Sequence, residues 1–180
     1  MPNWCDNSVT LYHEDKSKID ALEEILKKHS HDYSGPERTE AEGVLFHLRP
    51  RPDAEEDNWY SWNVENWGTK WDISPMDWNR DDENTIWMSF DSAWSPPTAL
   101  YEYLVTEEGW SITAEYQEPG IGFVGKFVDG YDECYEYDFE DEDWRDDIPE
   151  DLIDFAGLDQ SYEDWKEWRD DESEDEEKVD

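Results

Sequence analysis

Residues 85–116, TIWMSFDSAWSPPTALYEYLVTEEGWSITAEY, contain the signals of a strand, a helix and a second strand in direct succession. Apolar and polar residues alternate over 85–91, which is typical of a half-buried strand. Ser95 followed by two prolines indicates a helix start with proline at the first helical position, and Gly109 indicates the helix end. Alternation returns over 110–116. The stretch therefore predicts a β-α-β unit.

The chain before residue 85 predicts a second unit of the same kind. Residues 8–13 alternate like a strand, and residues 16–29 place apolar side chains at helical spacing. Ser-Gly-Pro at 34–36 breaks the chain, and the short apolar run 44–48 predicts another strand. Two such units form the ferredoxin-like split βαβ pattern, an α+β fold with two helices on one face of an antiparallel sheet.

The chain after residue 116 predicts an extension of this sheet. Residues 122–128 and 131–139 flank Asp129-Gly130, which is a strong hairpin signal. We therefore expect two more strands that continue the sheet as a β-meander. Residues 149–156 then predict a short helix that ends at Gly157.

A last helix is predicted to begin at residues 161–164, where Ser-Tyr-Glu-Asp resembles a capping box. One side of this helix carries Tyr162, Trp165 and Trp168, a stripe that we expect to dock it on the rest of the molecule. Almost no apolar residue follows residue 170, which predicts a frayed end.

The charge of the chain is extreme. Its 180 residues include 52 Asp and Glu against 14 Lys and Arg, a formal net charge of −38. Such a charge with few aromatic residues would indicate disorder. This chain instead holds 12 Trp, 10 Tyr and 6 Phe, side chains that dominate folded cores. A folded protein is therefore predicted.

The acids are concentrated toward the C-terminus. Residues 1–128 carry 26 acids and 10 bases, whereas residues 129–180 carry 26 acids and 4 bases. We expect a ferredoxin-like α+β domain at 1–140, and an acidic helical tail at 141–180 that packs on the domain and frays at its end. No linker rich in Gly and Ser marks the boundary.

Signatures of an enzyme or a metal site are weak. The four His show no metal-ligand spacing, and no phosphate loop, dinucleotide fingerprint or nucleophile elbow occurs. Cys5 and Cys134 are expected to be reduced cytosolic thiols rather than a pair, and Cys5 as a nucleophile would need a nearby base. We therefore predict no catalytic residue, no metal and no cofactor. The sequence also shows no signal peptide and no apolar stretch of membrane-spanning length.

Three blocks resemble the YubB-like family of phage and conjugative-plasmid proteins. They are Met-Pro-Asn-Trp-Cys-Asp-Asn at 1–7, Asn-Trp-Gly-Thr-Lys-Trp-Asp at 66–72, and Ala-Trp-Ser-Pro-Pro at 93–97. The resemblance covers residues 1–128 and implies a ferredoxin-like domain and a mobile-element origin. That family has no established activity, so the resemblance implies no catalytic residues. The acidic region from Asp129 goes beyond its pattern.

A candidate binding surface lies in the acidic region. If 131–139 is a strand, one of its faces is aromatic and the other is acidic, and the acids continue into the tail. Neighbouring acids on one strand face are about 6.6 Å apart, whereas duplex DNA has one charge per ~1.7 Å, so the tail must contribute. The candidate residues are Asp132, Glu136, Asp138, Glu140, Asp141, Glu142, Asp143, Asp146 and Asp147.

We therefore predict a mimic of DNA that binds and inhibits a basic nucleic-acid-binding defence protein of the host, such as a nuclease or restriction complex. The expected partner is that protein, with no direct nucleic acid and no membrane, and the molecule is a monomer or homodimer in the host cytoplasm. Alternatives are a merely solvated acidic face, a salt-adapted acidic protein, and a Ca²⁺ site in the loops at 129–133 or 140–143.

The aromatic segment 59–71 offers another alternative, a small binding module. Its rings are of the kind that stack bases or sugars, and Trp62, Trp67 and Trp71 would line the pocket. Its basic companion is Lys70, with Arg80 nearby, which is too little for tracking a phosphate backbone. Packing of a long connection against the sheet is the preferred interpretation.

Overall fold

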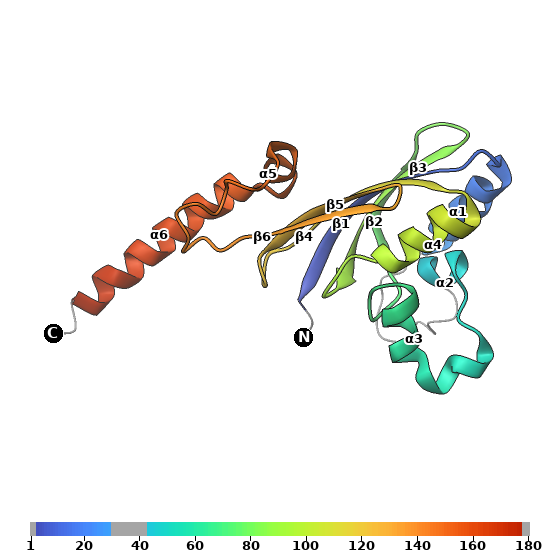
Figure 1. The fold of residues 1–180 in the computed structure, drawn as a ribbon, viewed down its shortest axis with the longest axis horizontal. Helices are drawn as coiled ribbons and strands as arrows, with labels where there is room; N and C mark the ends of the chain where they lie inside the picture. Colours follow the sequence, from blue (N-terminus) through green and yellow to red (C-terminus); the bar gives the residue numbers. More distant parts are fainter. Residues whose placement is uncertain (1–2, 30–42, 178–180) are drawn as a thin grey trace.

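The computed structural model describes residues 3–29 and 43–177, and these form an α+β fold around a six-stranded antiparallel sheet (Figure 1). The strand order is β2-β3-β1-β4-β5-β6. The strands are β1 (Trp4–Tyr12), β2 (Pro75–Arg80), β3 (Thr85–Ala93), β4 (Ser111–Glu118), β5 (Phe123–Val128) and β6 (Tyr131–Glu136). The α+β prediction is confirmed.

Seven helical segments connect or follow these strands in the described part of the chain. They are α1 (Lys16–His29), α2 (Val44–Leu48), the 3-10 helix η2 (Asp53–Asn58), α3 (Trp59–Asn66), α4 (Thr98–Glu108), α5 (Glu150–Ala156) and α6 (Leu158–Glu177). Within that part, no helix combines the length and the apolar composition needed to cross a membrane.

The main core lies between the sheet and helices α1 and α4. Val9 and Ile112 on the central strands pack with Ile19 on α1 and Leu100 on α4, all of them fully buried. Because successive strand residues point to opposite faces, the alternation seen in the sequence places these apolar side chains on one face. The connection from β1 through α1 to β2 passes over β3, and the connection from β3 through α4 to β4 passes over β1.

The strand predicted at 44–48 is wrong, because these residues form helix α2. The carboxylate of Asp72, 26 or more residues away, accepts hydrogen bonds from the backbone N–H groups of Leu45 and Phe46 at 2.8 and 2.9 Å. The backbone N–H groups at the start of α2 are therefore satisfied by a residue far along the chain, so the sequence next to α2 contains no capping pattern that could be recognised. The second strand is β2 instead, which is an edge strand that begins with proline.

The helix predicted after Ser95 is confirmed, but Ser95 does not cap it. The Ser95 hydroxyl donates to the carbonyl oxygen of Gly68 at 2.6 Å, and α4 begins after Pro97 without a side-chain cap. Gly109 ends the helix as predicted, because its φ of 74° is left-handed and favours glycine. The predicted chain break at 34–36 lies outside the described residues.

A second core covers the other face of the sheet at β5. Val124 packs there with Trp144, Ile148 and Leu152, whereas Phe127 on the same strand belongs to the main core. Residues three apart on a strand face opposite ways, so β5 is covered on both sides. The Lys126 ammonium also lies 2.9 Å from the carboxylate of Asp151 on α5. Residues 144–158 therefore pack on the sheet at β5.

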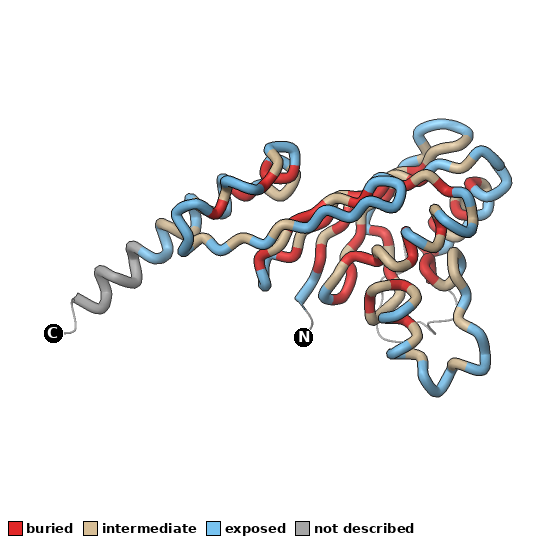
Figure 2. The backbone as a smooth tube through the Cα atoms, viewed as in Figure 1, coloured by how far each residue is buried: buried red, intermediate tan, exposed pale blue. Residues whose placement is uncertain are grey.

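Helix α6 begins at Leu158, three residues before the predicted capping box. The Ser161 hydroxyl donates to the carbonyl oxygen of Gly157, the residue before α6, and does not cap a helix that starts at 161. The helix continues to Glu177, so the frayed end predicted from residue 170 is not observed up to that residue. Figure 1 shows α6 leaving the sheet and extending away from it. Figure 2 shows that residues 159–169 of α6 are mostly exposed.

Candidate functional site

The nine predicted acids are all exposed, and they lie on one strand and the turns that follow it. Strand β6 ends at Glu136 rather than at residue 139. The alternation nevertheless continues, because Tyr137 and Phe139 pack with the second core while Asp138 and Glu140 remain exposed. The predicted division into an aromatic and an acidic side is confirmed through residue 140.

Asp132 is held in place by a tyrosine from two strands away. The Tyr116 hydroxyl on β4 donates to the Asp132 carboxylate at 2.7 Å. Its ring passes over Gly125 on the intervening strand, where an added Cβ would lie 2.4 Å from the ring. Burial, and then the hydrogen bond to Asp132, raise the pKa of Tyr116, so this hydroxyl stays protonated and keeps donating. Asp132 is therefore an oriented carboxylate.

The turns between β6 and α5 are built by the acids themselves. The Asp138 carboxylate accepts the backbone N–H of Glu140 at 3.0 Å, and the Asp141 carboxylate accepts that of Asp143 at 3.1 Å. These are the local turns that Asp side chains favour. Trp144 anchors the segment, because its buried ring contacts Phe139 with the centroids 5.1 Å apart. The acids therefore project from an ordered frame.

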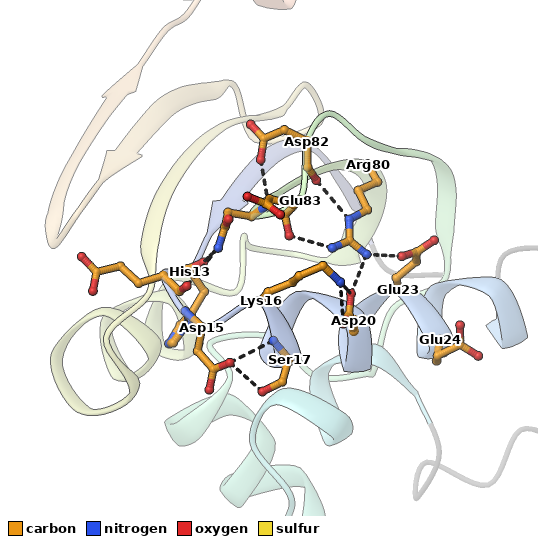
Figure 3. Close-up of polar contacts among 12 residues, drawn as sticks. His13, Asp15, Lys16, Ser17, Asp20, Glu23, Glu24, Arg80, Asp82 and Glu83 are labelled. Carbon is orange, nitrogen blue, oxygen red and sulfur yellow. Dashed lines mark hydrogen bonds and ion pairs between the residues drawn. The ribbon is translucent and has the colours of Figure 1, made fainter.

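Around helix α1, acids are neutralised by ion pairs. Arg80 at the end of β2 donates to Asp20 at 2.8 Å and to Glu23, both on α1 (Figure 3). Lys16 pairs with Asp20, and Lys27 pairs with Glu23. Hydrogen bonds from these lysines, followed by those from Arg80, lower the pKa values of the two carboxyls. Each of these charges is balanced at short range.

None of the nine candidate acids forms an ion pair with any other residue that the structure describes. Exposed acids elsewhere, such as Glu56, Asp57 and Glu102, also lack one, so the nine are distinguished by lying together on one strand and its turns. The bases near them are engaged elsewhere. Arg145 bonds to Glu150 and Asp159, Lys166 pairs with Glu163, and Arg169 lies over the Trp165 ring. The unbalanced negative charge of this surface is therefore available to a partner.

The alternative of a pocket lined by Trp62, Trp67 and Trp71 is not supported, because Trp67 is a core residue. Trp67 is fully buried in the main core and donates its indole N–H to the carbonyl oxygen of Arg49 at 3.0 Å. Trp62 packs edge-to-face on Trp67 with centroids 5.7 Å apart. These two rings fill space against the core, as the packing interpretation predicts.

A cluster of aromatic rings around Lys70 was not predicted, because Trp4 and Trp94 come from segments far from residues 59–71 in the sequence. The Lys70 ammonium lies 4.6 Å from the ring centroid of Trp71, 5.0 Å from that of Trp94 and 5.6 Å from that of Tyr60. Trp4 contacts Trp71 at 6.1 Å. Trp94 has a φ of 70° while its side chain is 39% exposed, so it combines backbone strain with a surface position.

A carboxyl pair on β1 and β3 was also missed. Asp6 and Asp91 are direct cross-strand partners, and the amide of Gln117 donates to Asp6 at 3.0 Å. One Asp91 carboxylate oxygen is buried and finds no hydrogen-bond partner in the described residues. Burial, and then the hydrogen bond and charge of Asp6, raise the pKa of Asp91. Only the register of the two strands brings this pair together.

Neither cysteine resembles an activated nucleophile. Both thiols are free, and Cys5 is fully buried. Burial raises the pKa of the Cys5 and Cys134 thiols, which disfavours the reactive thiolate. Across residues 3–29 and 43–177, no group of three or more His, Cys, Asp or Glu side chains is arranged to hold a metal ion, the loops considered for Ca²⁺ included.

Comparison with known proteins adds one distant structural likeness. No protein-family model and no curated protein matches the chain. The crystal structure of a protein api92 from Yersinia pseudotuberculosis, with the family model DUF1281, is similar with a TM-score of 0.49 and 13% identity. The likeness covers 77% of this chain and 99% of that one. The membership in the YubB-like family stays a prediction.

Proposed function

We propose that this protein imitates nucleic acid and inhibits a basic nucleic-acid-binding defence protein of the host, acting by binding rather than by catalysis. One observation carries the proposal: nine exposed carboxylates on an ordered strand and its turns have no ion-pair partner among the described residues. Leaving such charge unbalanced opposes folding through self-repulsion. A positively charged cleft supplies the missing countercharge, and charge complementarity of this kind speeds association.

The frame that carries the acids supports the proposal further. The acids lie on β6 and on turns fixed by Trp144 and by the Arg145 contacts to α5 and α6. A surface ordered before binding loses less conformational freedom when the partner docks. The mobile-element origin and the host-cytoplasmic location belong to the same proposal, because anti-restriction proteins act where the host meets incoming DNA.

A displacement experiment tests the proposal. Labelled duplex DNA is bound to each of a panel of purified host nucleases and restriction complexes, and the full chain is titrated in at 50 and 200 mM salt. We expect displacement from at least one of them at 50 mM salt, and weaker displacement at 200 mM because salt screens the charges. Failure to displace DNA from any panel member at either salt concentration would refute the proposal.

A matched pair of variants locates the surface. Glu142→Gln with Asp143→Asn removes two charges from the turns, and Glu56→Gln with Asp57→Asn removes two from η2, where both acids are exposed. We expect only the first pair to weaken displacement. Equal weakening by both pairs would show that total charge, rather than this surface, is recognised.

A second candidate function, a small binding module, is favoured by the cluster of Trp4, Tyr60, Trp71 and Trp94 around Lys70. Exposed rings beside an ammonium suit a flat ligand. Quenching of tryptophan fluorescence by mononucleotides or oligosaccharides, with loss of the quenching in Trp94→Ala, would support this function. Unchanged fluorescence at millimolar ligand would exclude those two ligand classes.

A further inference from the structure

Aromatic rings open to solvent gather where β1 begins and β3 ends. The Trp4 ring at the start of β1 contacts that of Trp71, and Trp94 directly follows β3. Tyr60 on α3 completes the group, because its ring and those of Trp71 and Trp94 surround the Lys70 ammonium. Trp4 and Tyr60 are each 45% exposed. The proposed acidic surface uses none of these side chains.

The backbone at Trp94 is strained, and this strain holds an exposed ring. Its φ of 70° is left-handed, which is an outlier for so bulky a residue. The Trp94 N–H donates to the carbonyl oxygen of Asn3 at 2.9 Å, and the Thr69 hydroxyl donates to that of Ala93 at 3.0 Å. The Trp94 ring belongs to neither core, and such strain costs more than one exposed contact with an ammonium returns. Strain that folding does not repay is typical of ligand clamps.

A pair of carboxyl groups lies beside these rings on the same face of the sheet. Trp4 and Asp6 are two residues apart on β1, so their side chains share a face and their Cα atoms are about 6.6 Å apart. Helices α1 and α4 cover the opposite face, on which Val9 is buried. Asp91 is the cross-strand partner of Asp6, and one of its oxygens finds no hydrogen-bond donor among the described residues. A hydroxyl group that enters beside Trp4 would supply that donor.

The charges around the rings favour an uncharged ligand. A phosphate is repelled by Asp6 and Asp91 and by the net charge of −38. A cation meets the Lys70 ammonium, which already lies among the rings. A sugar is uncharged, and its C–H faces pack on aromatic rings as other apolar surface does. Its hydroxyl groups donate to carboxylates and accept from an ammonium.

We propose that this cluster is a carbohydrate-binding site for uncharged oligosaccharides. The exposed rings of Trp4, Tyr60 and Trp94 pack against the sugar rings. Asp91 accepts hydrogen bonds from sugar hydroxyl groups, and Lys70 donates hydrogen bonds to them. This inference rests on the second candidate function and narrows its ligand from two classes to one, and it is independent of nucleic-acid mimicry by the acidic surface.

Isothermal titration calorimetry of the full chain tests the ligand class. The probes are maltohexaose, cellotetraose, xylohexaose and N-acetylchitotetraose, with adenosine and AMP in parallel. We expect at least one oligosaccharide to bind more tightly than adenosine and AMP, with an affinity that salt leaves unchanged because the ligand is uncharged. Binding of adenosine or AMP at least as tight as that of every oligosaccharide overturns the inference and leaves the binding module standing. Binding of no probe at millimolar concentration overturns both.

A variant at Trp94 separates ligand binding from folding. Trp94→Gly removes the ring and adopts the left-handed backbone without strain. We expect it to weaken oligosaccharide binding at least tenfold while the thermal midpoint stays level or rises. Trp4→Ala leaves that backbone untouched and is expected to weaken binding at least threefold, so the rings are tested even if Trp94→Gly does not fold. Trp168→Ala, which removes a ring 58% exposed on α6, should have no effect. Wild-type affinity in both cluster variants overturns the inference.

A pair of variants at Asp91 tests the polar contact. Asp91→Ala removes the acceptor and is expected to weaken oligosaccharide binding at least fivefold, because a sugar hydroxyl loses a charged partner. Asp91→Asn keeps one acceptor oxygen and is expected to lose less affinity than Asp91→Ala. Asp57→Asn, on η2, is the control and should bind like wild type. Unchanged affinity in Asp91→Ala contradicts the assignment of Asp91 to the site.

Discussion

At the scale of single residues, the Asp6–Asp91 pair shows what sequence patterns miss. The two carboxyls belong to strands about 85 residues apart, and their proximity depends on the β1–β3 register alone. The alternation in each strand predicts which face each residue occupies, but not which residue lies opposite. The exposed acids of β6 could be predicted, because side chains alternate between the two faces of a strand and this alternation is visible within one strand.

The raised pKa of Asp91 leads to a prediction about pH. The pKa of the Asp91 carboxyl is higher in the folded than in the unfolded protein. Its contribution to stability is therefore fully present below the unfolded pKa, and it is lost as the pH rises through the folded pKa. Asp91→Asn removes the charge, so the variant is expected to be more stable than the wild type at pH 7.5. The advantage should shrink toward pH 5.

Urea midpoints at pH 5, 6 and 7.5 measure this difference. Asp57→Asn is the matched control, because Asp57 is exposed on η2 and its substitution should shift stability equally little at each pH. If the difference in urea midpoint between Asp91→Asn and wild type stays constant from pH 5 to 7.5, the pKa of Asp91 is not raised in the folded protein.

Gly125 gives a second prediction at this scale. An added methyl group would meet the Tyr116 ring at 2.4 Å and the backbone oxygen of Glu133 at 2.6 Å. Gly125→Ala is therefore expected to cost ~1–3 kcal/mol through overpacking, and to release Asp132 from its tyrosine. Urea unfolding measures the cost. An unchanged midpoint would show that the two strands shift apart freely at this point.

At the scale of elements, the Arg80 network ties edge strand β2 to helix α1. Arg80 also donates to the backbone oxygens of Asp82 and Glu83 in the β2–β3 turn (Figure 3). Arg80→Gln removes the positive charge that Asp20 and Glu23 share, so these two carboxylates remain close together without the guanidinium that balances them. We expect the thermal midpoint to fall, because two carboxylates lose their shared hydrogen-bond donor. Arg51→Gln, a change of equal charge outside this network, serves as the control for the thermal midpoint.

Trp144 anchors the second core, and its removal tests how the tail depends on it. Trp144→Ala is expected to cost ~3 kcal/mol of tail docking, because a large buried ring is lost. Limited proteolysis should then cut between residues 137 and 150 before the sheet unfolds. Simultaneous loss of all protected fragments would show that tail and sheet unfold together.

The elements that were predicted correctly carry their signals locally. Strands β3, β4 and β5 and helices α1 and α4 have clear periodicity and end signals of their own, such as Gly109. Helix α2 and strand β2 do not. Asp72 caps α2 from a distant loop, and β2 reads Pro-Met-Asp-Trp-Asn-Arg, which has no strand preference. Their structure follows from tertiary contacts, which a local pattern cannot contain.

At the scale of the whole molecule, ion pairs gather at a few places such as α1 and Arg145, and most of the other acids in the described chain have none. Around α1 the acids pair with Arg80 and lysines, while the nine acids after β5 lack ion pairs in the described chain. The total of −38 was evident from the sequence, and so was its concentration after residue 128. Which acids find a base was not, because the pairs at Arg80 and Arg145 form across separate elements.

The unbalanced charge predicts a dependence of stability on salt. Raising KCl from 10 mM to 0.5 M should raise the thermal midpoint by roughly 3–6 °C, because screening weakens the self-repulsion. Glu142→Gln with Asp143→Asn should reduce this rise more than Glu56→Gln with Asp57→Asn. Failure to fold below molar KCl would instead favour the salt-adapted protein, and a midpoint independent of KCl would contradict both accounts.

The covering of β5 on both faces has a consequence during synthesis. Val124 leaves the ribosome 34 residues before Leu158, the last buried residue of the second core. At 5–20 residues per second, that face of the growing sheet is uncovered for roughly 2–7 s. The interval exposes an apolar strand to other nascent chains. The acids at 129–147 emerge in the same interval, and their mutual repulsion keeps neighbouring chains apart until the tail closes over the sheet.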